Sequence, residues 1–337
     1  MSETLFHYPG PFQLESGATL PGFHLAYTAY GSLNDTKSNV VWICHALTAN
    51  CHPEEWWPGL VGPGKLIDPA KHFIVCANML GSCYGSTYAL STNPETGSPW
   101  YHDFPLVTNR DIARSFDLLR EFLGVDRIHL GIGGSLGGQQ LLEWAIMKPG
   151  VLHHLAPIAT NAQHSPWGIA FNESQRLAIE ADITWRESHP DAGKTGLRAA
   201  RSIALLSYRS YDAYHQTQQE PDSGKLSDFR ATSYQQYQGD KLVNRFDAFA
   251  YWTLSKAMDS HNLGRGRGGV EQALAQIKAK TLAIAVDSDG LFPPSEQKLL
   301  AQHIPGAQYA EFSSPFGHDG FLIEFDAIAE AISKFMS

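Results

Sequence analysis

Short apolar runs recur along the chain and alternate with longer segments in which apolar residues repeat at helical spacing. Near-continuous apolarity over five or six residues is typical of strands that are buried on both faces. Regular alternation of such strands with helices predicts an α/β fold with a mostly parallel central sheet. The predicted strands are residues 39–44, 73–78, 127–132, 154–159, 281–286 and 308–313.

Residues 12–31 have a different pattern, which predicts an antiparallel hairpin packed on one edge of the sheet. Two helices are also predicted, over residues 108–123 and 136–149. Thr108 and Asp111 resemble a capping box at the start of the first helix, and Gly124 ends it.

The pattern changes between residues 166 and 264, where aromatic-rich helical segments replace the apolar runs. We interpret this region as a helical cap inserted into an α/β core. The predicted organisation is a first part of the core over 1–165, the cap over 166–264 and a second part of the core over 265–337. We interpret the sequence GRGRGG at 264–269 as a flexible connection between the cap and the second part of the core.

Composition narrows the possible partners of the protein. The 337 residues carry a formal net charge of −9, and no basic cluster is long enough to suggest binding to nucleic acid. No apolar run reaches the roughly 18 residues expected of a membrane span, and MSETLFHYPG has no features of a secretory signal. The four cysteines, at positions 44, 51, 76 and 83, lack metal-binding spacing. We therefore expect a reduced, cytoplasmic protein with no zinc site and no disulfide framework.

The stretch Gly133-Gly134-Ser135-Leu136-Gly137 fits the pattern G-x-S-x-G and lies between a predicted strand and a predicted helix. That context is the one required by a nucleophile elbow, in which a sharp turn raises the serine hydroxyl above the sheet. Glycines beside the serine leave room for the turn, and the serine takes a strained backbone conformation. A plain glycine-rich turn is the alternative, since no phosphate-binding fingerprint is present.

A serine hydroxyl needs a histidine to accept its proton and a carboxylate to orient that histidine. In the expected fold the chain order is serine, acid, histidine. Asp287 and Asp289 follow the predicted strand 281–286, and His318 follows 308–313. We prefer Asp289 as the acid because it lies farther into its loop, whereas Asp287 is placed to brace the turn.

Two backbone amides are predicted to stabilise an oxyanion. Leu136 begins a helix directly after the serine, and Leu47 lies in the loop after the strand 39–44. His45, in the same loop, is interpreted as a packing residue rather than a catalytic one.

Several stretches resemble the homoserine O-acetyltransferases of the α/β-hydrolase superfamily, and the resemblance extends from about residue 10 to 330. The stretches that carry it are HALTAN (45–50), GPGKLIDPAKHFIVCANMLGSCYGST (62–87), FPLVTNRDIARS (104–115), GGSLGGQQLLEWA (133–145), FNESQR (171–176), YQGDKLVNRFDAFAY (237–251), DSDGLFPP (287–294) and GHDGFLIE (317–324). The resemblance implies an α/β-hydrolase fold and acetyl transfer from acetyl-CoA to the hydroxyl of L-homoserine, a step toward methionine.

The resemblance also implies roles for individual residues. Ser135 would be acetylated first, His318 would act as base and acid in both half-reactions, and Asp289 matches the triad acid of the family. The stretch ARSIALLSY matches the family's substrate-binding arginine and tyrosine at Arg201 and Tyr208, and Asp319 matches its aspartate. No cofactor would stay bound, the partners would be small molecules, and relatives commonly form homodimers through the helical cap.

Two departures from the family pattern leave specificity open. The family usually has glycine and proline after GST, where this chain has GSTYAL with Tyr88, and methionine where Gln139 stands. Both residues are candidates to lie near the acyl or acceptor site. Alternative activities on the same scaffold are homoserine O-succinyltransferase, serine O-acetyltransferase and esterase, and a non-enzymatic receptor or scaffold is the remaining possibility.

Overall fold

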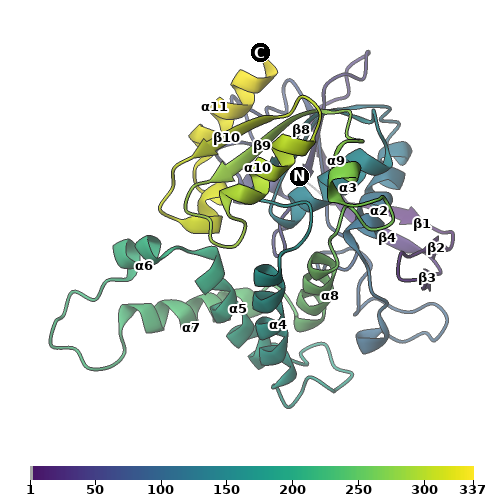
Figure 1. Cartoon of the computed structure of the whole chain (residues 1–337). Coiled ribbons are helices and arrows are strands. Elements are labelled where there is room, and N and C mark those ends of the chain that lie inside the picture. Colours follow the sequence, from purple (N-terminus) through teal and green to yellow (C-terminus); the bar gives the residue numbers. More distant parts are fainter. Residues whose placement is uncertain (1–2) are drawn as a thin grey trace.

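A central eight-stranded sheet with helices on both faces dominates the computed structural model, which describes residues 3–337 (Figure 1). From β6 to β10 neighbouring strands are parallel, whereas β1 and β4 are antiparallel at one edge. In spatial order the strands are β1 (Thr4–Tyr8), β4 (Phe23–Tyr30), β6 (Phe73–Ala77), β5 (Val40–Cys44), β7 (Ile128–Gly134), β8 (Leu152–Ile158), β9 (Lys280–Val286) and β10 (Gln308–Phe312).

Both faces of the sheet are buried, as β5 illustrates. Trp42 packs into the core on one face together with Trp144, their rings meeting edge to face at 5.0 Å, while Ile43 packs into the core on the other. Successive strand residues point to opposite faces, so a strand covered on both sides needs apolar residues at every position. This explains the continuous apolar runs of the central strands, whereas the edge strand β10 has no buried residue. All six predicted strands are confirmed.

The prediction for the N-terminal region is confirmed only in part. Within residues 12–31 only β2 (Phe12–Gln13) and β3 (Thr19–Leu20) form a small hairpin. The long strand β4 instead joins the main sheet. It pairs antiparallel with β1, upstream of the predicted hairpin, and with β6 on its other side. Prolines at positions 9, 11 and 21 lie between β1 and β4 in the chain. They lack the N–H group that donates a hydrogen bond between paired strands.

Helices of the core cover the two faces of the sheet. Helix α2 begins with the predicted capping box, in which the Asp111 N–H donates to Thr108 Oγ1 and the Thr108 N–H donates to the Asp111 carboxylate. Gly124 follows the helix at φ +65°, so the predicted end of the helix is confirmed. The bounds are α1 (Pro53–Trp56), α2 (Asn109–Phe122), α3 (Leu136–Met147), α9 (Val270–Leu274), α10 (Pro294–His303), α11 (Phe325–Met336), and the 3₁₀ helices η1 (Tyr101–Asp103) and η2 (Gly317–Leu322).

Between β8 and β9 the chain leaves the sheet and forms a separate group of helices (Figure 1). Helix α7 packs along α5, while α6 and the loop between α6 and α7 extend outward (Figure 1). We call α6, α7 and the loop between them the arm. No helix within residues 3–337 is both long and apolar enough to cross a membrane. The bounds are α4 (Pro166–Glu180), α5 (Lys194–Tyr208), α6 (Tyr211–Gln218), α7 (Arg230–Val243) and α8 (Ala248–Asp259).

The arginines of the GRGRGG stretch are held by ion pairs, so the interpretation of this stretch as a flexible connection is wrong. Arg265 donates two hydrogen bonds to the Glu15 carboxylate, one to each oxygen, at 2.9 and 3.0 Å. Arg267 lies 2.7 Å from the buried Glu143, and Arg110 pairs with both glutamates. Glycines permit the tight turns here, while the arginines fix the segment to the core.

Candidate active site

Ser135 occupies the turn between β7 and α3 with φ 57° and ψ −125°. A positive φ is uncommon for a residue with a side chain and costs about 1–3 kcal/mol, so the surrounding structure must hold it. The Ser135 N–H donates to the Ile158 carbonyl at 2.9 Å, and the Thr160 hydroxyl donates to the Ser135 carbonyl at 2.7 Å. The predicted strained conformation is confirmed.

Two glycines allow this turn to pack against β5. A Cβ on Gly137 would lie 2.1 Å from the carbonyl oxygen of Cys44, and one on Gly133 would lie 2.8 Å from the same oxygen. Neither distance is compatible with a carbon side chain. The backbone of β5 therefore approaches the elbow so closely that only glycine fits at both positions.

The structure brings Ser135, His318 and Asp289 together, although 183 residues separate the first two. Ser135 Oγ lies 2.9 Å from His318 Nε2, and His318 Nδ1 lies 2.7 Å from Asp289 Oδ2. All three are at most 5% exposed. Phe292 stacks on the His318 ring at 5.0 Å, and Phe321 meets the ring edge to face at 5.2 Å. These contacts restrict the imidazole to one orientation.

The two candidate carboxylates have separate surroundings. Asp289 Oδ1 accepts hydrogen bonds from the N–H groups of Leu291 and Phe292, both at 2.8 Å, which leaves Oδ2 for the histidine. Asp287 instead accepts from the Ser314 N–H at 3.0 Å. Asp289 thus orients the imidazole, while Asp287 joins the two loops that follow β9 and β10.

A cavity of about 70 Å³ lies above the Ser135 hydroxyl. Leu136 is the first residue of α3, where a helix leaves its backbone N–H groups without intrahelical acceptors. Leu47 lines the cavity from the loop after β5. The cavity is lined by Ala46, Leu47, Thr48, Ser135, Arg201, Tyr208, His318, Asp319, Phe321 and Leu322.

Arg201, Tyr208 and Asp319, which the family resemblance implies as substrate-binding residues, all line this cavity. The Arg201 guanidinium lies 5.4 Å from the centre of the Tyr208 ring, which in turn lies 5.9 Å from the His318 ring. Asp319 Oδ2 is paired with Arg209 Nε at 3.0 Å. Burial raises the pKa of Asp319, while the positive charges of Arg209 and Arg201 act in the opposite direction.

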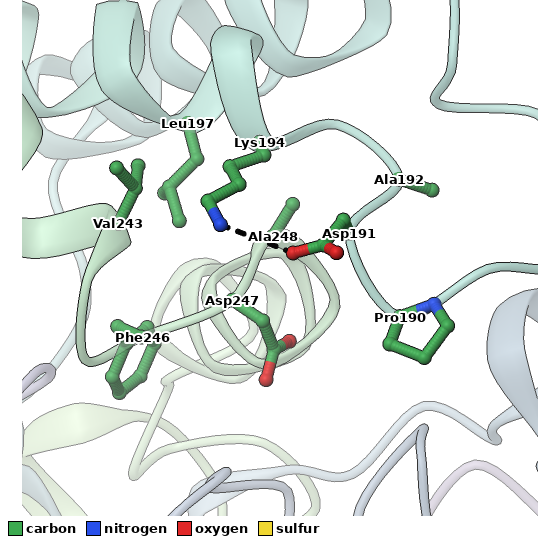
Figure 2. Close-up of a pocket in the computed structure, with 9 residues that line it drawn as sticks. All are labelled: Pro190, Asp191, Ala192, Lys194, Leu197, Val243, Phe246, Asp247 and Ala248. Carbon is green, nitrogen blue, oxygen red and sulfur yellow. Dashed lines mark hydrogen bonds and ion pairs between the residues drawn. The ribbon is translucent and has the colours of Figure 1, made fainter.

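A second hollow lies in the helical region, apart from the serine and the histidine (Figure 2). Its volume is about 40 Å³, and its rim carries an ion pair between Lys194 and Asp191 at 3.1 Å. Figure 2 also shows the Asp247 carboxylate, which caps α8 by accepting from the Ala250 N–H. These charged groups already have partners within the protein, so the hollow offers little to a substrate.

Comparisons with known proteins agree with the observed fold. A family model described as the alpha/beta hydrolase fold matches residues 39–325. A homoserine O-acetyltransferase of Cyclobacterium marinum is 51% identical over 335 residues, covering 99% of this chain and 95% of the relative. The chain belongs to the homoserine O-acetyltransferase family.

Solved structures resemble this family member over its whole length. The homoserine O-acetyltransferase from Bacillus anthracis superposes with a TM-score of 0.91 at 25% identity, covering 100% of this chain and 97% of that one. Esterase E22 superposes equally well, with a TM-score of 0.91 at 26% identity and complete coverage of both chains. The fold and the elbow are thus compatible with both acyl transfer and ester hydrolysis.

Sequence analysis of this family member missed Arg209, which forms the ion pair with Asp319. It stands one residue after the matched stretch ARSIALLSY, eight positions after Arg201. Because Arg209 follows the end of α5 in an extended conformation, its spacing from Arg201 gives no helical signal for the contact. Thr160, which braces Ser135, carries no sequence pattern either.

The two departures from the family pattern lie outside the cavity lining. Gln139 is buried one turn behind Ser135, where it accepts from Asn109 and donates to Asn161 at 3.0 and 2.9 Å. Tyr88 also does not line the cavity. His45 is buried, its Nδ1 donates to the Ala46 carbonyl, and burial lowers its pKa to about 4, consistent with packing.

Gly137→Ala tests the packing of the elbow. The added methyl would meet the Cys44 carbonyl at 2.1 Å, so we expect the serine to lose its position and reactivity. Labelling of Ser135 by a fluorophosphonate, followed by mass spectrometry, should fall at least about tenfold and Tm should decrease. Gly224→Ala is the control, because the nearest atom to its added Cβ is 3.4 Å away. Normal labelling of Gly137→Ala would refute the steric argument.

Proposed function

We propose that this protein transfers an acetyl group from acetyl-CoA to the hydroxyl of L-homoserine, with Ser135 carrying the acetyl group between the two half-reactions. The observation that carries the proposal is the hydrogen-bonded series Ser135–His318–Asp289 facing a cavity that also holds Arg201 and Asp319. Membership of the family supports the choice of donor and acceptor.

In the first half-reaction Ser135 Oγ attacks the thioester carbonyl carbon while its proton passes to His318 Nε2. Asp289 accepts from Nδ1–H and stabilises the imidazolium that forms. The tetrahedral intermediate collapses by breaking the C–S bond, and His318 returns the proton to the departing CoA thiolate. The amides of Leu47 and Leu136 are the proposed oxyanion donors, each contributing about 3 kcal/mol to the transition state.

In the second half-reaction the homoserine hydroxyl gives its proton to His318 and attacks the acetyl carbon. Collapse breaks the bond to Ser135 Oγ, which takes the proton back and releases O-acetyl-homoserine. Arg201 would pair with the substrate carboxylate, and Tyr208 would hold the guanidinium in place by its ring. Asp319 would accept the ammonium group, with Arg209 fixing the orientation of its carboxylate.

Ester hydrolysis is the second candidate, because esterase E22 shares the whole fold. Water would then replace homoserine in the second half-reaction. Two observations favour homoserine over bulk water as the acceptor. Ser135 and His318 are buried, and the charged groups Arg201 and Asp319 suit an acceptor that carries both a carboxylate and an ammonium group.

Acetyl-CoA mixed with the purified protein should release CoA continuously only when L-homoserine is present. Thiol release with a chromogenic disulfide measures this, with succinyl-CoA and L-serine as the alternative substrates. Ser135→Ala should lower kcat by about four to six powers of ten, because a triad acts as a unit. Continuous CoA release that ignores homoserine would support the hydrolase instead.

Arg201→Gln should separate the two half-reactions. We expect single-turnover acetylation of Ser135 to be unchanged, while KM for homoserine rises about 10- to 100-fold through loss of a charge-assisted contact. Arg198→Gln is the matched control, since it lies on the same helix and pairs with Asp240 at the surface. An equal effect of both substitutions on homoserine would contradict the assignment of Arg201.

We further propose a cytoplasmic homodimer formed through the arm of α6 and α7. All four cysteines are free, and burial raises the pKa of each thiol, as suits a reducing compartment. Large apolar side chains are exposed along the arm: Tyr211, Leu226, Phe229 and Tyr237. A second copy of this chain would remove them from water.

Charge on the arm should prevent dimer formation. We expect the double variant Leu226→Glu with Tyr237→Glu to be monomeric by light scattering at micromolar concentration, while the parent protein is dimeric. Ile183→Glu is the control, because Ile183 is equally exposed, at 94%, but lies outside the arm. A monomeric parent, or dissociation by the control alone, would contradict the proposal.

A further inference from the structure

Three histidines gather at the end of the sheet opposite to the catalytic loops. His129 is the second residue of β7, and His153 and His154 are the second and third residues of β8. The two strands are parallel neighbours, with Leu130 opposite His154. Ser135 follows the other end of β7, so the strand itself separates this cluster from the nucleophile.

The three side chains are close enough to share one ion. Each offers a ring nitrogen, and these nitrogens all lie within 4.8 Å of one another. The ring centres of His153 and His154 are 4.3 Å apart, and those of His129 and His154 are 5.2 Å apart. A zinc ion holds its nitrogens at about 2.0–2.1 Å, which places them about 3.3 Å apart in a tetrahedron. Small rotations of the three side chains would bring their nitrogens from within 4.8 Å of one another to the spacing that zinc requires.

The backbone fixes one of the rings in a ligating form. His154 Nδ1 lies 3.0 Å from the carbonyl oxygen of His129 and donates to it. Its Nε2 therefore carries the lone pair. Metal-binding histidines commonly use one ring nitrogen in this way, because the hydrogen bond sets the tautomer and the ring direction.

The surroundings favour a metal that binds neutral nitrogen. Burial is the main cause that lowers the pKa of His129 and of His154, and the charge of His153 acts in the same direction on both. Lys280 and His72 lie close by and would oppose any cation by charge alone. No carboxylate belongs to this cluster in the part of the chain that the structure describes. This donor set suits zinc, nickel or copper and does not suit magnesium or calcium.

Access to the cluster is open on two sides. The side chain of His153 is exposed to solvent. A cavity of about 320 Å³ lies beside His129 and His72, bordered by Ser333 and Met336 at the end of α11. An ion and a water molecule completing its coordination can therefore enter without rearrangement of the sheet.

We propose that His129, His153 and His154 form a binding site for a divalent transition metal such as Zn²⁺, with water as the fourth ligand. The ion joins the first residues of β7 to those of β8. It stabilises the folded sheet by binding the folded state alone, and it takes no part in acyl transfer.

Calorimetric titration of the untagged, chelator-treated protein with ZnCl₂ tests the proposal. We expect one ion per chain and an increase in Tm with added zinc. His153→Asn should weaken zinc binding at least about tenfold and abolish the increase in Tm, because the exposed ring contributes to binding rather than to the core. Co²⁺ as a substitute should give the visible absorption of a tetrahedral site, and CoA release should be the same with and without zinc.

His52→Asn is the matched control. His52 belongs to the other group of potential ligands in residues 3–337, together with Glu3 and Cys51. It should leave zinc binding unchanged. Absence of binding by the parent protein, or loss of binding in His52→Asn with retention in His153→Asn, would overturn the proposal.

Discussion

The close approach of the β5 backbone to the turn at Ser135 is the constraint on which the rest of the site depends. The Cys44 carbonyl occupies the space where side chains at 133 and 137 would project, so glycine is required at both positions. The turn can then hold the serine at φ 57°. The Ser135 N–H donates to the Ile158 carbonyl, and the Thr160 hydroxyl donates to the Ser135 carbonyl. These two hydrogen bonds hold Ser135 in a backbone conformation that a serine rarely adopts.

Loops at the same edge of the sheet supply the histidine and the carboxylate that are hydrogen-bonded in series to the nucleophile. Parallel strands all end on one side, so the loops after β5, β9 and β10 converge there although they are far apart in the chain. The cap contributes Arg201 and Tyr208 from α5, which closes the cavity from above. The cavity is thus lined from two structural layers, the loops of the core and helix α5.

Charged pairs connect these layers. Arg209, directly after α5, binds Asp319 in the core, which is adjacent to His318 in the chain. Arg265 and Arg267, which directly follow the cap in the chain, bind Glu15 and Glu143 within the core. Such partly buried ion pairs add little net stability, because desolvation of the charges offsets their attraction.

The sequence by itself determined the order of strands and helices, the elbow at Ser135 and the candidates Asp289 and His318, because burial on both faces and a sharp turn each impose a local pattern. It did not determine the partner of β4, the ion pairs of the GRGRGG stretch, or the Arg209–Asp319 contact. Those depend on which surfaces meet after folding, and no local pattern encodes a contact between residues 110 positions apart. The choice between Asp287 and Asp289 was likewise decided by tertiary structure, since only one carboxylate reaches the imidazole.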